Sequence, residues 1–187
     1  MKTILTILVF SITGLISSFQ PAQPAQPDTL TYEQRQFFQA MQALCGNSYS
    51  GEVVFPEEAP QGFTDPLVAH FTICEDNELH IPFHVGENTS RTWMFTLSDE
   101  GLLFKHDHRH PDGTPERMTN YGGWGDDRGD EFGQYFPADE ETIALRDNLR
   151  SHIWKAEVSD DMTTFSYSLY IWENLYFRAD FDLTNPI

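Results

Sequence analysis

The sequence predicts a mainly β protein: a single antiparallel barrel with a meander order of strands, one helix before the strands and one short helix before the last strands. Three observations carry this prediction. Apolar and polar residues alternate with a period of two in many short segments after residue 49, turn residues separate these segments, and only two stretches show helical spacing. A β-sandwich is the alternative. We favour closure, because long open sheet edges promote pairing between molecules.

The first residues have the layout of a secretory signal peptide. A lysine precedes an apolar run, Ile4 to Ile16, which is too short to span a membrane, and small residues follow it up to Ser18. We therefore predict a signal peptide over residues 1–18, a Pro/Gln-rich spacer over residues 19–28 and one folded domain over residues 29–187. The predicted location is secreted or periplasmic, with no membrane insertion once the signal is removed.

Charge limits the partners of the chain. The sequence has 29 acidic and 11 basic residues, which gives a formal net charge of −18. A polyanion has to be met by clustered Lys or Arg, so nucleic acid and anionic membrane surfaces are poor partners. Acidity of this kind mainly supports solubility. The partner we predict is a small molecule, for reasons given below, and the oligomeric state is not specified by the sequence.

The chain has two cysteines, Cys45 and Cys74. An even number of cysteines in an exported protein favours a disulfide, with two separate buried thiols as the alternative. The bridge would join the end of the first helix to the end of an early strand. Closing the loop between residues 45 and 74 should contribute roughly 3–4 kcal/mol to folding stability in the chain-entropy model.

The elements before the histidine-rich region follow local patterns. Residues 32–44 have helical spacing with Thr31 as the cap, and residues 67–85 form a hairpin whose Pro82 indicates an edge strand or a bulge. Residues 121–133, rich in Gly and Asp, are expected to form a loop. Asp139 should cap a short helix that ends near residue 148.

The most informative stretch is Lys105-His106-Asp107-His108-Arg109-His110. In an extended strand, residues at every second position project from one face, so the three imidazoles share a face. The preceding segment, residues 92–97, alternates as well and is joined to residues 102–106 by a turn. The expected register places Phe95 opposite Phe104, Trp93 opposite His106 and Arg91 opposite His108, so the histidines continue the core-facing side of the hairpin.

This register leads to the first function hypothesis, a small-molecule-binding barrel. Its site would lie at one end of the interior, where Arg91 could hold an anionic group through a forked hydrogen bond. The predicted ligand-binding residues are Trp93, His84, His106, His108 and Arg91. Lys105 and Arg109 lie on the other face of the strand and are expected to be solvated and to pair with carboxylates.

Two further hypotheses remain, one with a metal site on the same histidines and one with no ligand site. The predicted metal ligands are His106, His108, His110 and His84, which suit zinc in a metal-binding protein or a metal-dependent hydrolase. The third hypothesis is an envelope interaction or structural module without a ligand. The sequence contains no complete catalytic set, so we predict no catalytic residues and lean towards a protein that is not an enzyme.

Two resemblances add to these predictions. The segment Leu44 to Gly51 resembles the start of lipocalin-like barrels, with Tyr49 where that family typically has Trp, and this resemblance implies binding of small hydrophobic molecules. Five segments are similar to a family of exported bacterial proteins of unassigned function, which implies an exported single domain and no particular chemistry. These segments are Ile81–Glu87, Ser90–Trp93, Lys105–His110, Tyr121–Gly123 and Phe136–Asp139.

Overall fold

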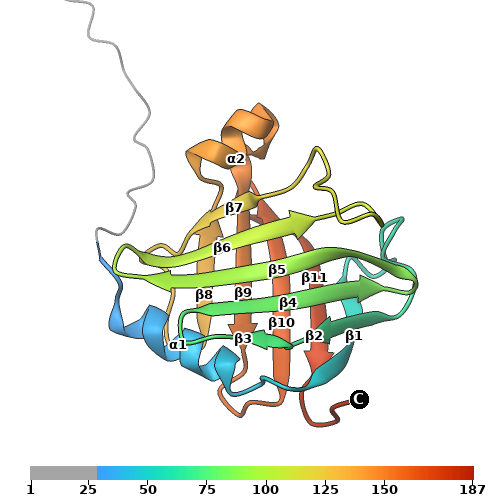
Figure 1. The fold of residues 1–187 in the computed structure, drawn as a ribbon, viewed down its shortest axis with the longest axis horizontal. Helices are drawn as coiled ribbons and strands as arrows, with labels where there is room; N and C mark the ends of the chain where they lie inside the picture. Colours follow the sequence, from blue (N-terminus) through green and yellow to red (C-terminus); the bar gives the residue numbers. More distant parts are fainter. Residues whose placement is uncertain (1–28) are drawn as a thin grey trace, which may run out of the picture.

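The computed structural model describes residues 29–187, so the predicted signal peptide and spacer lie outside the described residues. Within this range the chain forms eleven strands, two α-helices and one 3₁₀ helix (Figure 1). In chain order they are α1 (Tyr32–Gln42), β1 (Ser48–Phe55), β2 (Leu67–His70), β3 (Ile73–Cys74), β4 (Glu78–Val85), β5 (Asn88–Ser98), β6 (Gly101–His108), β7 (Tyr121–Trp124), β8 (Gly133–Pro137), α2 (Glu140–Leu145), η1 (Asp147–Ser151), β9 (His152–Val158), β10 (Thr164–Ile171) and β11 (Asn174–Asp182).

The strands form one antiparallel sheet that is nearly closed into a barrel, as the sequence predicted. Their order is β7-β6-β5-β4-β2-β1-β11-β10-β9-β8, and the short β3 pairs with β4. Almost every strand therefore lies beside its neighbour in the chain, and β1 joins the first half of the meander to the last strand, β11. In Figure 1 the front strands β4, β5 and β6 run across the back strands β8 to β11.

The barrel closes between β7 and β8, where glycines allow the backbones to approach. A Cβ atom added to Gly123 would lie 1.8 Å from the carbonyl oxygen of Pro137, so a larger residue cannot occupy this position without a backbone shift. Two backbone hydrogen bonds join the β7 and β8 segments, and we call this junction the seam. They run from Asp139 N to Gly122 O and from Asp126 N to Tyr135 O, each 3.0 Å. The prediction of a loop over residues 121–133 was therefore wrong for its first four residues, which form β7, and for its last, Gly133, which begins β8.

Helix α1 covers one end of the barrel. Its cap is the predicted Thr31, and the helix ends two residues earlier than predicted. Phe37, Phe38 and Met41 point into the barrel and are buried. Gln34 secures the position, because its side-chain oxygen accepts from Leu102 N (3.2 Å) at the start of β6.

The predicted disulfide between Cys45 and Cys74 is present and ties the segment after α1 to β3. Pro82 of β4 pairs with Thr92 of β5, while on the other side of β4 the pairing with β2 ends at Phe83 and that with β3 begins at His80. Pro82 therefore lies opposite the gap between β2 and β3. Neither strand pairs with β4 at this position, so the absent N–H of proline costs no hydrogen bond between strands.

The second predicted helix begins at its cap, Asp139, but is interrupted at Arg146 and continues as η1. Asp139 has a second role that the sequence did not reveal. Its Oδ2 lies 2.6 Å from Lys105 Nζ, and Glu141 lies 3.2 Å from the same ammonium group. Lys105 is only 6 % exposed, so the expectation that it is solvated was wrong. Arg109 is exposed, as expected, and pairs with Asp107.

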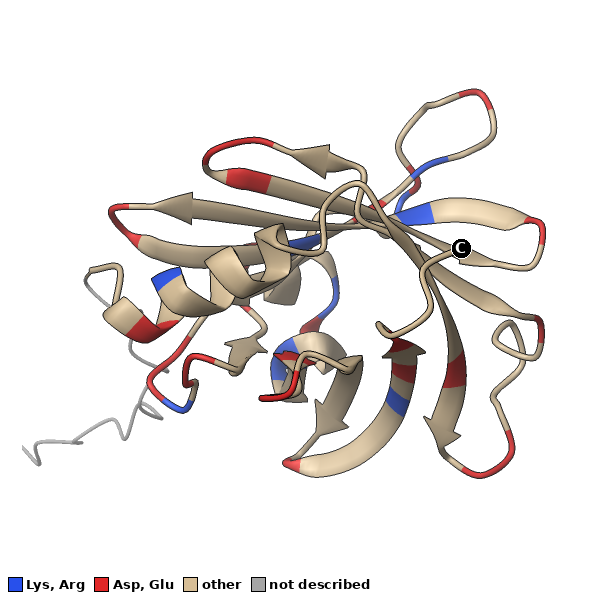
Figure 2. Cartoon of the chain, turned by 90° about the horizontal axis from the view of Figure 1, so that it is seen from below, with Lys and Arg blue, Asp and Glu red and all other residues tan. Residues whose placement is uncertain are grey.

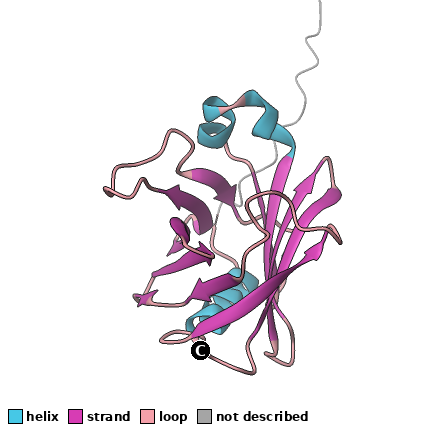
Figure 3. Cartoon of the chain, turned by 90° about the vertical axis from the view of Figure 1, so that its right-hand side faces the viewer, coloured by secondary structure: helices cyan, strands magenta, loops and turns pink. Residues whose placement is uncertain are grey.

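Many of the acidic residues lie in turns and at strand ends, where water solvates them (Figure 2). Among the described residues, no helix is long and apolar enough to cross a membrane. The helical segments lie at opposite ends of the molecule, α1 at one end and α2 with η1 at the other (Figure 3).

Candidate functional site

The end of the barrel remote from α1 carries polar side chains on its inner face. The β5–β6 hairpin has the predicted register: Phe95 pairs with Phe104, Trp93 with His106 and Arg91 with His108. Because Gln34 of α1 is bonded at the start of β6, the last residues of β6 lie at the opposite end. We call Arg91, His106, His108, Tyr121 and Tyr167 the mouth cluster.

His106 forms the buried floor of the mouth cluster. It is 3 % exposed, and burial lowers its pKa from the ordinary 6.5 to about 3, so the ring is neutral at pH 7. Its Nδ1 lies 3.0 Å from the carbonyl oxygen of Tyr121 and must donate, since a carbonyl only accepts. Nε2 is then an acceptor, and the hydroxyl of Tyr167 donates a hydrogen bond to it at 2.8 Å. Both nitrogens are therefore occupied by structural hydrogen bonds.

Trp93 is part of the core beneath the cluster. It is 2 % exposed and stacks between Phe83 and Tyr167, with ring centroids 4.4 Å and 4.6 Å away. Its ring fixes the position of Tyr167 and, through it, that of His106. Because stacked aromatic rings fill this part of the barrel, Trp93 packs beneath the cluster and exposes almost none of its surface.

His108 lies two residues after His106, at the end of β6, and is half-buried. Its Nε2 is 3.0 Å from Tyr121 Oη. Burial and, second, the charge of Arg91 lower the pKa of His108, which leaves the imidazole neutral at pH 7. Burial raises the pKa of Tyr121 to about 12, so its hydroxyl keeps its proton. These groups are neutral hydrogen-bonding partners around a single cation, Arg91.

Arg91 is the exceptional residue of the cluster. Its Nη1 is buried and has no hydrogen-bond partner. None of the ion pairs found within residues 29–187 involves Arg91. The guanidinium instead lies over the ring of Phe63, 5.2 Å from the centroid. Burial raises the pKa values of Tyr121 and Tyr167, and the charge of Arg91 partly offsets this increase, whereas for His108 the same charge adds to the lowering caused by burial. A permanent cation in so acidic a chain thus has an unused donor at the barrel mouth.

Phe63 covers the mouth from the long segment between β1 and β2. Its half-buried ring stacks on Phe83 at 6.3 Å and contacts Phe177 at 4.8 Å. A flat ring is therefore compatible with the surface that Arg91 and the two core phenylalanines present. Sequence reasoning missed Phe63, because no periodicity marks a single aromatic residue inside a polar, proline-containing loop.

His152, at the start of β9, is a second residue that the sequence did not single out. Its Nδ1 is buried without a hydrogen-bond partner, and burial lowers its pKa. His152 pairs with Ile171, the last residue of β10. It lies at the same end of the barrel as the mouth cluster. Tyr121 was missed as well, because it lies on β7, in the segment expected to be a loop.

The structure separates the four histidines predicted as metal ligands. His84 lies on the outer face of β4, between the inward Phe83 and Val85, whereas His106 and His108 face inwards and His110 is exposed. Within residues 29–187, no group of three or more His, Cys, Asp or Glu side chains is arranged to hold a metal ion. Of the predicted ligand-binding residues, the structure brings together Trp93, His106, His108 and Arg91.

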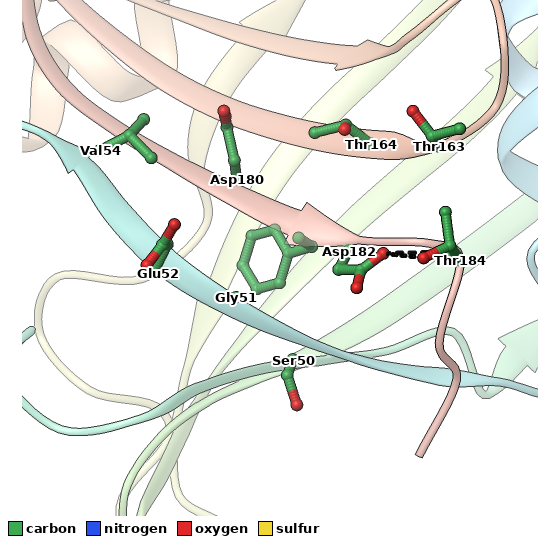
Figure 4. A pocket seen from close by; sticks show the side chains of 10 residues that line it. Ser50, Gly51, Glu52, Val54, Thr163, Thr164, Asp180, Asp182 and Thr184 are labelled. Atoms are coloured by element: carbon green, nitrogen blue, oxygen red, sulfur yellow. Dashed lines mark hydrogen bonds between the residues drawn. The ribbon is translucent and has the colours of Figure 1, made fainter.

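Two hollows on the outer wall are alternatives to the mouth. The larger, about 590 Å³, lies over β1, β10 and β11 (Figure 4). Two of the three carboxylates in its lining already have hydrogen-bond donors: Asp180 accepts from Arg178, and Asp182 accepts from Thr184. The smaller, about 390 Å³, has Arg128 and Tyr135 in its lining, and Arg128 is paired with Asp126. Neither lining includes one of the unpartnered nitrogens of Arg91 and His152.

Comparisons with protein-family models, with curated proteins and with solved structures returned no match. The two resemblances noted in the sequence therefore remain expectations. The nearly closed barrel agrees with a barrel-like resemblance only at the level of the fold.

Proposed function

We propose that the chain is an exported β-barrel protein that binds a small anionic molecule at the barrel mouth. The observation that carries the proposal is the Nη1 donor of Arg91, buried and without a partner on an inward-facing residue. A buried donor left unpaired costs roughly 1–3 kcal/mol, and a carboxylate or sulfonate would recover this by accepting its hydrogen bond. Export is supported by the disulfide and by the predicted signal peptide.

The rest of the ligand would be flat and apolar. Phe63 shows that an aromatic ring fits against the guanidinium of Arg91 and against Phe83 at once. Since the deeper barrel is filled by the rings of Trp93 and its neighbours, the ligand would occupy the mouth and move Phe63 aside. His108 and Tyr121 would supply further hydrogen bonds at the rim.

A matched pair of fluorescent probes tests the proposal. Anilinonaphthalene sulfonate carries an anionic group on an aromatic body, and N-phenylnaphthylamine has the same body without the charge. We expect the folded protein at pH 7.5 to bind the sulfonate at least tenfold more tightly than the amine. Arg91→Gln should remove this preference, because charge-assisted hydrogen bonds contribute roughly 1.5–3 kcal/mol. Arg109→Gln, at an exposed residue near the same end, is the control and should retain it.

A second candidate function, an interaction module without a ligand, is favoured by the filled interior. The same titration separates the two. If neither probe binds the native protein, or if Arg91→Gln binds the sulfonate as tightly as the wild type, the mouth is not an anion site. Native mass spectrometry of freshly isolated protein would then report whether any molecule accompanies the chain.

A further inference from the structure

Outside the mouth cluster, the outer wall of the barrel carries a chain of three hydrogen-bonded side chains. Ser48 of β1, His70 of β2 and His84 of β4 lie on adjacent strands and face away from the core. Ser48 Oγ is 2.7 Å from His70 Nδ1, and His70 Nε2 is 2.9 Å from His84 Nδ1. We call these residues the outer histidine pair, with Ser48 as its support.

The sheet holds this arrangement in place. Ser48 is directly opposite His70 in the β1–β2 ladder, and Val68, two residues before His70, is opposite His84 in the β2–β4 ladder. Side chains two residues apart on a strand share a face, so His70 and His84 are diagonal neighbours. The two half-buried rings, 4.3 Å apart between centroids, are within reach of solvent ions.

From this geometry we propose that His70 and His84 form a binding site for a divalent transition-metal ion, with copper(II) as the preferred class. Two imidazole nitrogens already converge, and neutral imidazole is a common ligand for copper, nickel and zinc. The protein supplies two ligands, and water or a further small ligand completes the coordination. The proposal is independent of the anion site, which lies on the inner face.

The distance between the two nitrogens selects among metals. With a metal–nitrogen bond of about 2.0–2.1 Å, ligands at the right angle of a square-planar ion lie about 2.9 Å apart, whereas tetrahedral ligands lie about 3.3 Å apart. The observed separation of 2.9 Å matches the square-planar value. Copper(II) therefore matches the spacing of the two nitrogens, and a tilt of both rings would turn their lone pairs from each other towards the ion. Zinc would require the nitrogens to move apart as well.

Ser48 would act as a positioning residue. When Nε2 of His70 binds a metal, the ring carries its proton on Nδ1 and donates it to Ser48 Oγ, which accepts. His84 then carries its proton on Nε2. Each ring keeps one proton in the metal-bound state, and the ion replaces the hydrogen bond between the two rings. Partners of this kind commonly change metal affinity 10- to 100-fold.

The test is copper(II) titration of the full chain, produced for export and purified without an affinity tag, followed by calorimetry and electron paramagnetic resonance. We expect one copper(II) ion per chain, with a spectrum that shows coupling to two imidazole nitrogens. His70→Asn and His84→Asn should each weaken binding at least tenfold. His80→Asn is the matched control, because His80 lies on the same face of β4 and pairs with Glu78.

Ser48 provides a second readout. Ser48→Ala should weaken binding tenfold or more, while Ser48→Thr, which keeps the hydroxyl, should restore most of it. The proposal fails if both histidine variants retain full affinity, or if copper is lost only on His110→Asn, which would place the ion on the exposed end of the His108–His110 segment. It also fails if no stoichiometric binding is seen. Unchanged melting temperatures of the variants exclude unfolding as the cause of a loss.

Discussion

Acidification should reveal His106 as a group that stabilises the fold only while it is neutral. The folded-state pKa of His106 is about 3, against about 6.5 for the unfolded chain. Below pH 6.5 the unfolded chain binds a proton that the folded chain refuses, so folding stability falls as pH falls and levels off near pH 3. Between pH 7.5 and pH 5 this single group should remove about 2 kcal/mol of folding free energy.

The measurement is urea unfolding across this pH range for the wild type and His106→Gln. The variant should be less stable at pH 7.5, because it disturbs the bonds to Tyr121 and Tyr167. Its disadvantage should shrink by about 2 kcal/mol at pH 5, since only the wild type loses the contribution of this histidine. His110→Gln, at an exposed position, should follow the wild type. A gap that stays constant with pH would refute the assignment of His106 as a buried neutral ring.

Three further changes test the fold around the site. Gly123→Ala should destabilise the barrel by about 2 kcal/mol or more in urea unfolding, because the new methyl group meets a backbone carbonyl across the seam. Lys105→Met should cost about 3 kcal/mol by leaving Asp139 without its buried partner, and a variant as stable as the wild type would contradict the pairing. Replacing both Cys45 and Cys74 by Ser should lower the free energy of unfolding by about 3–4 kcal/mol, and an unchanged value would contradict a structural role.

The parts of the fold that could be predicted from the sequence are those in which local pattern and burial agree. The β5–β6 hairpin is the clearest example, because a polar turn separates two alternating segments and only one register buries both apolar faces. The same agreement located α1, where Thr31 caps an amphipathic segment, and Gly46 follows its end. The inward direction of His106 followed from this register.

The parts that could not be predicted depend on contacts between distant segments. Strand β7 consists of Tyr121, two glycines and Trp124, a composition typical of loops, and it forms a strand because β6 and the seam with β8 supply its partners. Lys105 is buried because α2 brings Asp139 to it, across 34 positions of sequence. No local pattern near Lys105 indicates this pairing.

The histidines show why closeness in sequence is a poor guide to a shared site. Six of the seven lie between residues 70 and 110, yet the sheet divides them by parity: His106 and His108 share the inner face with Phe104, while His70 and His84 share the outer face. The parity of His84 was readable from its position between Phe83 and Val85. Its contact with His70 was not, because it requires the pairing of β2 with β4. The barrel therefore carries two separate pairs of imidazoles. The inner pair, His106 and His108, is hydrogen-bonded to tyrosines and lies beside Arg91. The outer pair, His70 and His84, faces away from the core. Ligands of opposite charge would be expected on the two faces.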